Sequence, residues 1–338
     1  MTEFEINNKV SLETANQIEK YLKGWGFPSL IIIINSMSLF LKLPKQFKQL
    51  NSTLCIAQRG SGKSTLILHI LAKSNPKIFQ ILPKKMFESL LIKNQKSFFD
   101  KKALAHDDII VAFGGLSKKQ REQLVNFFVL LLSDGTYDRQ DINHLKDINC
   151  LAHFGIAKES YAKYRRELLD ATFLDRFATF QVSIDRDEKI AILNHRDRLK
   201  EENNELPKIK LPYFKRPIIV KLNLTDEIKK ERNRLAIELD DYNVMSFARA
   251  QNYIDLFMMS NSLFNNRKET NEQDLEIYKK VHPYHLNSCG ELKQEDLVKK
   301  YITNNPDIGF KEISKRLSIA KTTFYNILKR LKERGDIE

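Results

Sequence analysis

Cysteine is scarce in this sequence, and the few cysteines it contains are far apart. The 338 residues include 3 cysteines, Cys55, Cys150 and Cys289. Their positions lack the close spacing of a metal site, and an odd number cannot form a complete set of disulfides. We therefore expect a reducing compartment, the cytoplasm, with Cys55 and Cys150 as small core residues in apolar runs.

Long hydrophobic runs are also absent. The most apolar stretch, Leu30 to Ile34, is far shorter than the roughly 20 residues that cross a bilayer. The first residues, Met1 to Glu5, are acidic and lack the apolar centre of a signal peptide. We expect a soluble protein that has no membrane partner.

Acidic residues are outnumbered by basic ones. The chain has 56 Lys+Arg against 43 Asp+Glu, a formal net charge of +13. A positive protein attracts polyanions over the range of a Debye length, which favours nucleic acid as a partner. An anionic membrane surface or solubility alone would also account for this charge.

The sequence does contain a phosphate-binding pattern, S-T-L-C-I-A-Q-R-G-S-G-K-S-T-L, from Ser52 to Leu66. Its apolar start predicts a strand, Gly60 and Gly62 predict a loop, and the apolar residues after Thr65 predict a helix. This order is what a P-loop requires, because glycines let backbone N–H groups close around phosphate oxygens and the helix N-terminus is electropositive. The predicted nucleotide-binding residues are Ala57, Gln58, Arg59, Gly60, Ser61, Gly62, Lys63, Ser64 and Thr65.

Lys63 and Ser64 carry the chemistry of this pattern. Lys63 would reach the β- and γ-phosphates of ATP, and the Ser64 hydroxyl would bind Mg²⁺. Ala57 stands where the pattern has its first glycine, and its small side chain should preserve the loop. The alternative is a chance match in a surface loop.

Phosphoryl transfer also needs an acidic group at the end of a neighbouring strand, and Asp107 and Asp108 follow the apolar run Ala103 to His106. If that run is the strand, Asp107 would hold Mg²⁺ together with Ser64, and Asp108 would polarise the attacking water. If Ile109 to Phe113 is the strand instead, both carboxylates lie at its wrong end. The site would then bind nucleotide without hydrolysing it.

Further elements continue an α/β pattern. Ser117 to Ser133 predicts an amphipathic helix capped by Ser117, and Ile148 to Phe154 predicts another strand. Within that strand Asn149 and His153 could contact a γ-phosphate, or could have structural roles.

The order of these motifs resembles that of AAA+ ATPases, and Thr172 to Ile184, T-F-L-D-R-F-A-T-F-Q-V-S-I, is similar to the S-R-F stretch of the minichromosome maintenance (MCM) helicases. The resemblance implies that Arg176 completes the ATP site of a neighbouring subunit, in a ring or filament. It also implies that Arg249, in S-F-A-R-A-Q, is a second sensor arginine. With Asp108 in place of the family's Glu, the chain resembles a reduced MCM-like or origin-recognition-like protein, of the kind found on archaeal mobile elements.

Composition divides the chain into four parts. Residues 1–50 predict a helical collar, 51–185 the P-loop core, 186–285 a helical lid and 292–338 a DNA-binding module. The charged, proline-containing segment from Glu201 to Pro217 predicts a linker or a loop out of the core.

The C-terminal part contains a helix-turn-helix pattern. Phe310 to Leu317 predicts one helix, Ser318 to Ala320 a turn, and the residues from Lys321 a recognition helix. The pattern resembles the winged-helix domains of MCM and origin-recognition proteins, and a three-helix interaction module is the alternative. The residues predicted to contact DNA are Lys321, Thr322, Thr323, Tyr325, Asn326, Lys329 and Arg330.

These patterns together predict an α/β protein, with a P-loop AAA+ three-layer core, a helical lid and a C-terminal all-α, winged-helix-like domain. We expect it to hydrolyse ATP with Mg²⁺ and to act on DNA in replication initiation, helicase loading or DNA remodelling. A nucleotide-gated DNA-binding regulator with little or no hydrolysis is the alternative, and a partitioning or packaging motor is a second one. The predicted catalytic residues are Asp107, Asp108, Arg176, Arg249 and His153.

Overall fold

The computed structural model describes most of the chain. The predicted helix 87–93, most of the predicted helix 160–169 and Cys289 lie outside the described residues. The described residues are 2–43, 47, 51–82, 96–114, 116–139, 143–145, 147–161, 173–201, 206–242, 244–288, 291–304, 308–317 and 319–337.

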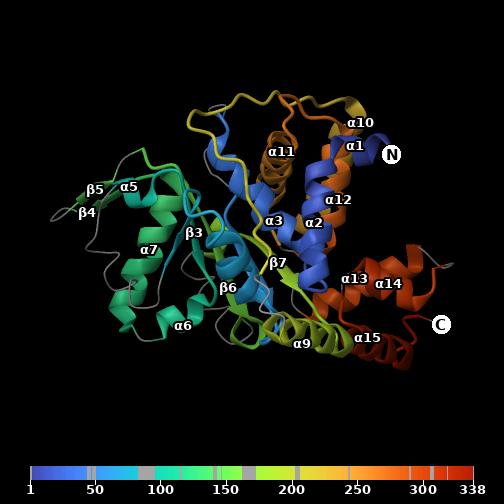
Figure 1. The fold of residues 1–338 in the computed structure, drawn as a ribbon. Helices are drawn as coiled ribbons and strands as arrows, with labels where there is room; N and C mark the ends of the chain where they lie inside the picture. Colours follow the sequence, from blue (N-terminus) through green and yellow to red (C-terminus); the bar gives the residue numbers. More distant parts are fainter. Residues whose placement is uncertain are drawn as a thin grey trace.

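A five-stranded parallel sheet lies at the centre of the molecule, in the strand order β2-β3-β6-β1-β7 (Figure 1). Because every pair is parallel, the strands end together at one edge, which we call the carboxyl edge, and begin together at the opposite, amino edge. The strands are β1 (Thr53–Ala57), β2 (Phe79–Ile81), β3 (Lys102–His106), β6 (Cys150–Ala157) and β7 (Ala178–Val182).

Helices cover both faces of this sheet. One face packs against α6 (Ile109–Phe113) and α7 (Lys118–Asp134), while the other packs against η2 (Thr65–Ala72), α3 (Gly26–Met37) and α12 (Glu272–Leu286). Successive residues of β1 enter different cores, because side chains alternate across a strand. The predicted α/β class and the three layers of the core are therefore confirmed.

A short antiparallel hairpin, β4 (Tyr137–Arg139) paired with β5 (Asn143–Leu145), lies between α7 and β6. The sequence predicts only a turn here. Gly135 does provide that turn, since it ends α7 in the left-handed conformation with a φ of 63°. The strands that follow are too short and polar to give a recognisable alternation.

The N-terminal helices and the lid helices share one core. α1 (Glu3–Asn7) and α2 (Lys9–Tyr21) pack with α3 against α11 (Phe247–Phe264) and α12, and α10 (Asp226–Asp241) packs on the far side of α11. Short helices complete the chain: η1 (Ser38–Phe40), α5 (Lys96–Phe99) and η3 (Leu174–Arg176).

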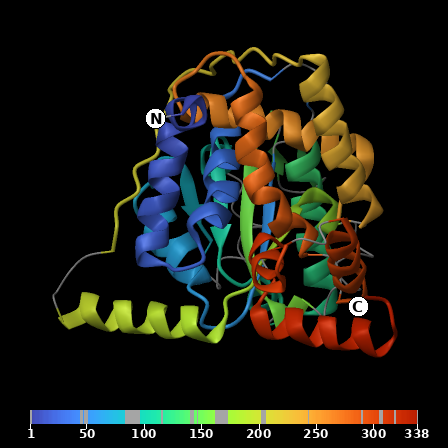
Figure 2. The same cartoon turned by 90° about the vertical axis from the view of Figure 1, so that its right-hand side faces the viewer.

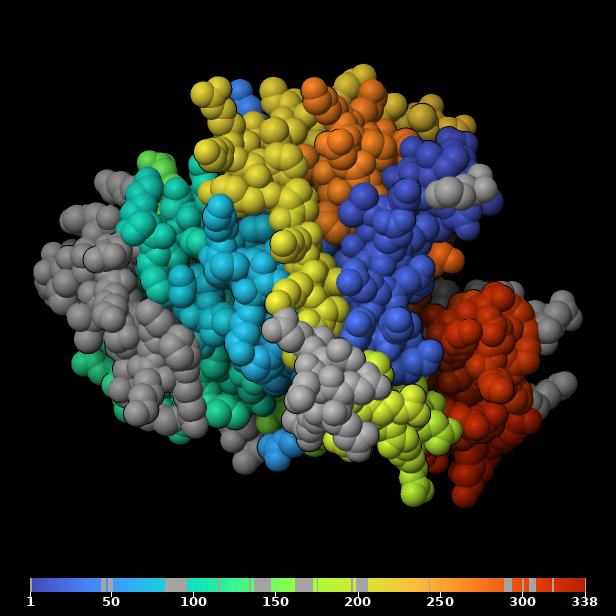
Figure 3. Space-filling view, viewed as in Figure 1, coloured from blue at the N-terminus to red at the C-terminus, as the bar shows by residue number. Residues whose placement is uncertain are grey.

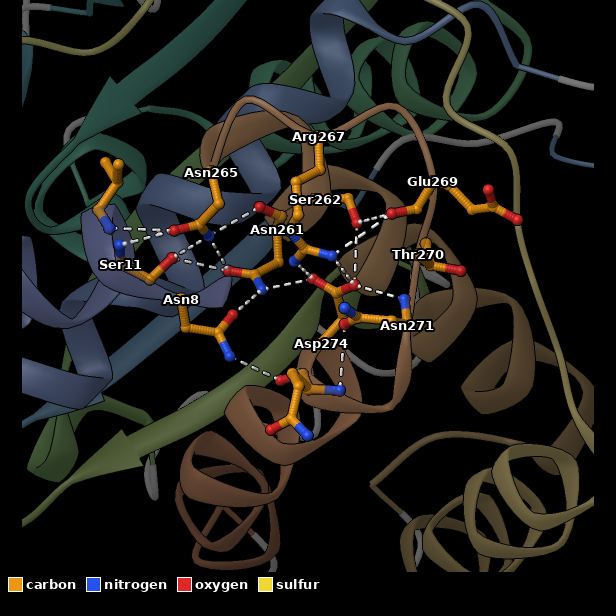
Figure 4. A network of polar contacts seen from close by, with 12 residues as sticks. Asn8, Ser11, Asn261, Ser262, Asn265, Arg267, Glu269, Thr270, Asn271 and Asp274 are labelled. Atoms are coloured by element: carbon orange, nitrogen blue, oxygen red, sulfur yellow. Dashed lines mark hydrogen bonds and ion pairs between the residues drawn. The ribbon is translucent and has the colours of Figure 1, made fainter. Parts of the chain in front are cut away.

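A buried polar network ties α2 to the lid (Figure 4). At its centre the fully buried Asp274 carboxylate accepts hydrogen bonds from Asn261 and Ser262 and forms an ion pair with Arg267. Asn261 also bonds to Asn8, and it accepts a hydrogen bond from Ser11, at 2.7 Å. A network with these partners fixes the N-terminal helices on the lid.

The segment 206–224 is extended and lies against the body of the molecule, where it is the yellow chain in Figure 3. Asn75 holds its backbone twice, through the Ile209 carbonyl at 2.7 Å and the Leu211 N–H at 2.7 Å. Ile218 pairs with Leu41 in an isolated bridge. The predicted loop out of the core is therefore wrong for these residues, since Ile209 and Leu211 are buried.

Three helices form the C-terminal part, α13 (Glu291–Asn304), α14 (Phe310–Arg316) and α15 (Lys321–Glu333). They lie at the same end of the molecule as α9 (Arg186–Glu201), which extends along its base in Figure 2. The sequence also predicts an apolar interior for this part, and the residues expected there are all buried: Leu317, Phe324, Ile327, Leu328 and Leu331.

Across the described residues, the helices are all too short or too polar to cross a membrane.

Candidate functional site

The predicted phosphate loop, residues 58–64, lies at the carboxyl edge, between β1 and η2, and is called the phosphate loop below. Gly60 and Gly62 have φ angles of 75° and 90°, which only glycine adopts readily. Ala57, by contrast, is the last residue of β1 and pairs with Ala157 and Val182 in a regular register. The position where the motif has its first glycine thus requires no glycine in this chain.

The predicted strand Ala103 to His106 is confirmed as β3, and Ile109 to Phe113 forms helix α6 rather than a strand. Asp107 and Asp108 therefore lie at the carboxyl edge, beside the phosphate loop. The Ser64 hydroxyl donates to the Asp107 carboxylate at 2.7 Å, and the Lys63 ammonium donates to the Asp107 backbone carbonyl. The structure thus brings together the predicted metal-binding pair and the predicted phosphate-binding lysine.

Lys63 is 8% exposed. Burial lowers its pKa, and the neighbouring thiol and the two carboxylates oppose this shift. Burial raises the pKa of the Cys55 thiol, in the strand beneath, to about 12. Cys55 is therefore an unreactive thiol that fills the core beside the lysine.

Gly155 in β6 allows Lys63 and Asp107 to approach each other, a role that was not predicted from the sequence. β6 lies between β1 and β3, and a Cβ atom at Gly155 would approach the Lys63 ammonium to 2.8 Å and clash with the Asp107 carbonyl oxygen. A glycine inside an apolar strand is a sequence sign of such close backbone approach.

Asp108 caps the N-terminus of α6. Its carboxylate accepts a hydrogen bond from the Ile110 N–H at 3.2 Å, and it also lines the cleft beside the phosphate loop. One oxygen is thus engaged in capping, while the carboxylate as a whole remains partly exposed.

A cleft of ≈ 1340 Å³ opens above the carboxyl edge. One wall consists of the phosphate loop with Asp107 and Asp108, and residues from the end of α2 and from α9 form another wall. On that wall the rings of Tyr21 and His195 meet edge to face, with centroids 5.3 Å apart. The local sequence of these helices predicts no chemistry, because nothing in it places them beside the loop. The apolar residues with which this part of the chain lines the cleft are Leu22, Ile192 and Leu193.

His153 lies outside this cleft, so a γ-phosphate contact by His153 is wrong for this chain. β6 continues to Ala157, so that His153 lies in the middle of this strand and pairs with Thr53, the first residue of β1 at the amino edge. Its ring bonds to the hydroxyls of Ser36 and Thr53, at 2.9 and 2.7 Å, and is fully buried. Burial lowers its pKa to about 3, which keeps the ring neutral. Asn149 precedes β6 and donates to the Leu39 carbonyl at 3.3 Å, so it too has a structural partner.

Arg176 and Arg249 do not line the cleft. Arg176 ends η3, just before β7, and so lies at the amino edge. A five-residue strand spans roughly 16 Å, which separates this arginine from the phosphate loop of its own chain. Arg249 lies in the first turn of α11 and is partly exposed. Arg176 could therefore reach a phosphate loop only in another copy of the chain.

The predicted DNA-contacting residues lie on α15. All of them are at least partly exposed, and the ring of Tyr325 is 43% exposed. Two of them form ion pairs: the Arg330 guanidinium pairs with Glu295 of α13 at 2.6 Å, and the Lys329 ammonium pairs with Glu333 of α15 at 3.8 Å. After α15 the described residues form a turn at Gly335, so the wing of a winged helix stays a prediction.

The sequence has no match among protein-family models or curated proteins. The fold and the predicted phosphate loop together define an α/β protein in which helices cover both faces of a five-stranded parallel sheet. Among solved structures, the chain is similar to a full-length MCM homologue from Methanopyrus kandleri, with a TM-score of 0.52 and 13% sequence identity. The match covers 85% of this chain but 61% of that protein.

Proposed function

We propose that this protein is an AAA+ ATPase that acts on DNA, in replication initiation, helicase loading or DNA remodelling. The observation that carries the proposal is the cluster at the carboxyl edge, where Lys63, Ser64 and Asp107 converge below the phosphate loop. Similarity in fold to an MCM homologue supports the AAA+ class and a DNA-related role at this coarse level.

The residues at the carboxyl edge fit a nucleotide with a magnesium ion. Lys63 would neutralise the β- and γ-phosphates, while Ser64 and Asp107 supply the hydroxyl and carboxylate oxygens that Mg²⁺ prefers. When bound, the ion supplies charge neutralisation at the phosphates. The Ser61 hydroxyl, buried in the loop without a hydrogen-bond partner among the described residues, is consistent with a loop prepared for a ligand.

In ATP hydrolysis, Asp108 and the two arginines would have separate roles. Asp108 would orient and polarise the attacking water with its free carboxylate oxygen. Arg176 would act on the site of a neighbouring copy in a ring or filament, because it lies at the amino edge of its own chain. Arg249 would contribute in the same way from the lid.

α15 would contact DNA. Lys321, Thr322, Thr323, Tyr325 and Asn326 form its exposed first half, which a recognition helix presents to the major groove. Lys329, which pairs with Glu333 of the same helix, would lie near a phosphate, whereas Arg330 is paired with Glu295 of α13. The runner-up function is a nucleotide-gated DNA-binding regulator with little or no hydrolysis, in which the same site serves only to bind.

Steady-state ATP hydrolysis, measured with and without duplex DNA, tests this proposal. We expect Asp108→Asn and Arg176→Ala to keep ATP binding while each lowers turnover by roughly 1000-fold. Mixing Arg176→Ala with Lys63→Ala should restore part of the activity, because mixed assemblies contain sites with an intact loop and an intact arginine.

Tight ATP binding without turnover under any of these conditions would instead favour the nucleotide-gated regulator. If the Arg176→Ala variant turned over ATP at the wild-type rate, Arg176 would not complete the ATP site of a neighbouring copy.

A further inference from the structure

The phosphate loop rests on the turn between α2 and α3. The chain has 1 tryptophan, Trp25, and it lies in this turn with its side chain fully buried. The Trp25 indole N–H donates a hydrogen bond to the Ser61 carbonyl, with the nitrogen and oxygen 2.5 Å apart. A residue 36 positions earlier in the sequence thus holds the backbone of the phosphate loop.

This hydrogen bond fixes more than one carbonyl. The carbonyl of Ser61 and the N–H of Gly62 belong to one planar, trans peptide unit, in which they point in opposite directions. If the carbonyl is held towards Trp25, the N–H of Gly62 is held away from it. In a phosphate loop such backbone N–H groups are the donors to phosphate oxygens.

The turn that carries Trp25 is itself rigidly built. The Glu19 carboxylate accepts hydrogen bonds from the N–H groups of Gly24 and Gly26, at 3.0 and 2.9 Å. Gly24 has a φ of 80°, and a Cβ atom at Gly26 would lie 2.9 Å from the Ala15 carbonyl oxygen. The position of the indole is therefore set by α2 and not by the phosphate loop.

Leu22 closes the remaining space under the loop. A Cβ atom at Gly62 would lie 3.1 Å from the Leu22 side chain and 3.6 Å from the indole nitrogen. The loop peptide is thus packed against these two residues, of which Trp25 lies outside the lining of the cleft. It has little freedom to rotate while Trp25 holds its carbonyl.

We infer that Trp25 is a positioning residue of the nucleotide site, which orients the Ser61–Gly62 peptide so that the Gly62 N–H faces the phosphates. The inference rests on the proposed nucleotide-binding function. Trp25 touches no substrate itself and acts through the loop backbone. Its effect should therefore appear in the binding of phosphate groups, whatever base they carry.

The inference can be tested by calorimetric titration of the full chain with Mg²⁺·ATP and with inorganic pyrophosphate. The three proteins to compare are the wild type, Trp25→Phe and Tyr253→Phe. Trp25→Phe keeps an aromatic ring and removes the N–H donor. Tyr253→Phe is the matched control, because the Tyr253 hydroxyl bonds to Asn35 and His285 in the same N-terminal core, away from the loop. Urea unfolding of each protein measures how much stability each change costs.

We expect Trp25→Phe to weaken both ligands by the same factor, roughly 5-fold, the size of one lost hydrogen bond. Tyr253→Phe should lower stability and leave both affinities unchanged. Wild-type affinities in Trp25→Phe would overturn the inference, and so would an equal loss in both variants, which would indicate a general effect of stability.

The wild-type protein gives a second measurement that needs no variant. Since Trp25 is the sole tryptophan, its emission reports the loop directly, and saturating ATP should shift it. An unchanged emission in a protein that binds ATP by calorimetry would overturn the inference while leaving the nucleotide site intact. If the wild-type protein bound neither ligand, the proposed function and this inference would both be wrong.

Discussion

Both edges of the central sheet carry polar side chains, but these side chains differ in their burial and in their hydrogen-bond partners. At the carboxyl edge Lys63 and Ser64 both donate hydrogen bonds to Asp107, beside an open cleft of ≈ 1340 Å³. At the amino edge, beside the first residue of β1, His153 bonds through both ring nitrogens to hydroxyls, and it is fully buried. Asn51 on the same side donates to Asn35 and to the Tyr253 carbonyl.

The difference shows that polarity at a strand end is a weak sign of function. A buried polar group needs partners, and the amino edge provides them within the protein, so its groups are occupied and unavailable to a ligand. The carboxyl edge combines charged groups with solvent access, because parallel strands there lead into loops and helix N-termini. Substitutions at matched positions of the two edges can test this contrast.

The largest expected effect is that of Lys63→Ala, compared with Lys102→Ala. Lys102 begins β3 at the amino edge and donates to the Lys77 carbonyl at 2.8 Å. Lys63→Ala should weaken ATP binding by roughly 100-fold, because it removes charge-assisted hydrogen bonds to phosphate. Lys102→Ala should leave the affinity unchanged, as measured by titration calorimetry. Equal effects of the two would contradict the assignment of the site to one edge.

Gly155→Ala should disturb the site from within the sheet. The new methyl group would collide with the Asp107 carbonyl and the Lys63 side chain, costing about 1–3 kcal/mol of unfolding free energy. We also expect weaker ATP binding, since the lysine must move. Gly309→Ala is the control, because it has a φ of −63° and no atom within 4 Å of the added Cβ. Chemical denaturation and ATP titration of both variants would show whether only the first is affected.

The buried His153 at the amino edge should make the stability of the protein depend on pH. In the folded protein burial lowers the pKa of His153 to about 3, below its ordinary value of 6.5. Between these values the unfolded chain binds the proton more tightly, so stability is full above about pH 6.5 and falls as the pH drops.

His153→Gln should flatten this dependence, by up to about 1.4 kcal/mol per pH unit, in urea titrations at several pH values between 4 and 8. His285, whose pKa burial also lowers to about 3, would retain its own share of the slope. An unaltered slope in His153→Gln would mean that this ring is not buried and neutral. ATP binding at neutral pH should not change.

The smallest effects come from one serine at each edge. Ser36→Ala removes the partner of the His153 Nε2 atom and should cost about 1 kcal/mol of unfolding free energy, with normal ATP affinity. Ser64→Ala should leave stability nearly unchanged and weaken ATP binding only when Mg²⁺ is present. Denaturation and titration with and without Mg²⁺ would check both expectations. Weaker ATP binding in Ser36→Ala, or lower stability with normal ATP affinity in Ser64→Ala, would contradict the difference between the edges.

Much of the fold follows from local sequence. The helix predicted from Ser117 to Ser133 is present as α7, and Ser117 caps it in a capping box with Gln120. The strand before Asp107 was also predictable, because an apolar run followed by two acidic residues indicates where a strand ends. These features depend on neighbours in the chain, which propensity and periodicity describe directly.

Local sequence thus predicts the glycine-containing loop after β1, the acidic pair and most helices. The surroundings of His153, Gly155 and Trp25 depend on the tertiary structure. β6 extends three residues beyond its predicted end, which places His153 in the middle of the strand, beside the start of β1, and Gly155 between Lys63 and Asp107. Trp25 meets Ser61 only because α2 and α3 fold onto the loop. Such roles arise from strand register and from contacts between distant segments, which no local pattern in the chain encodes.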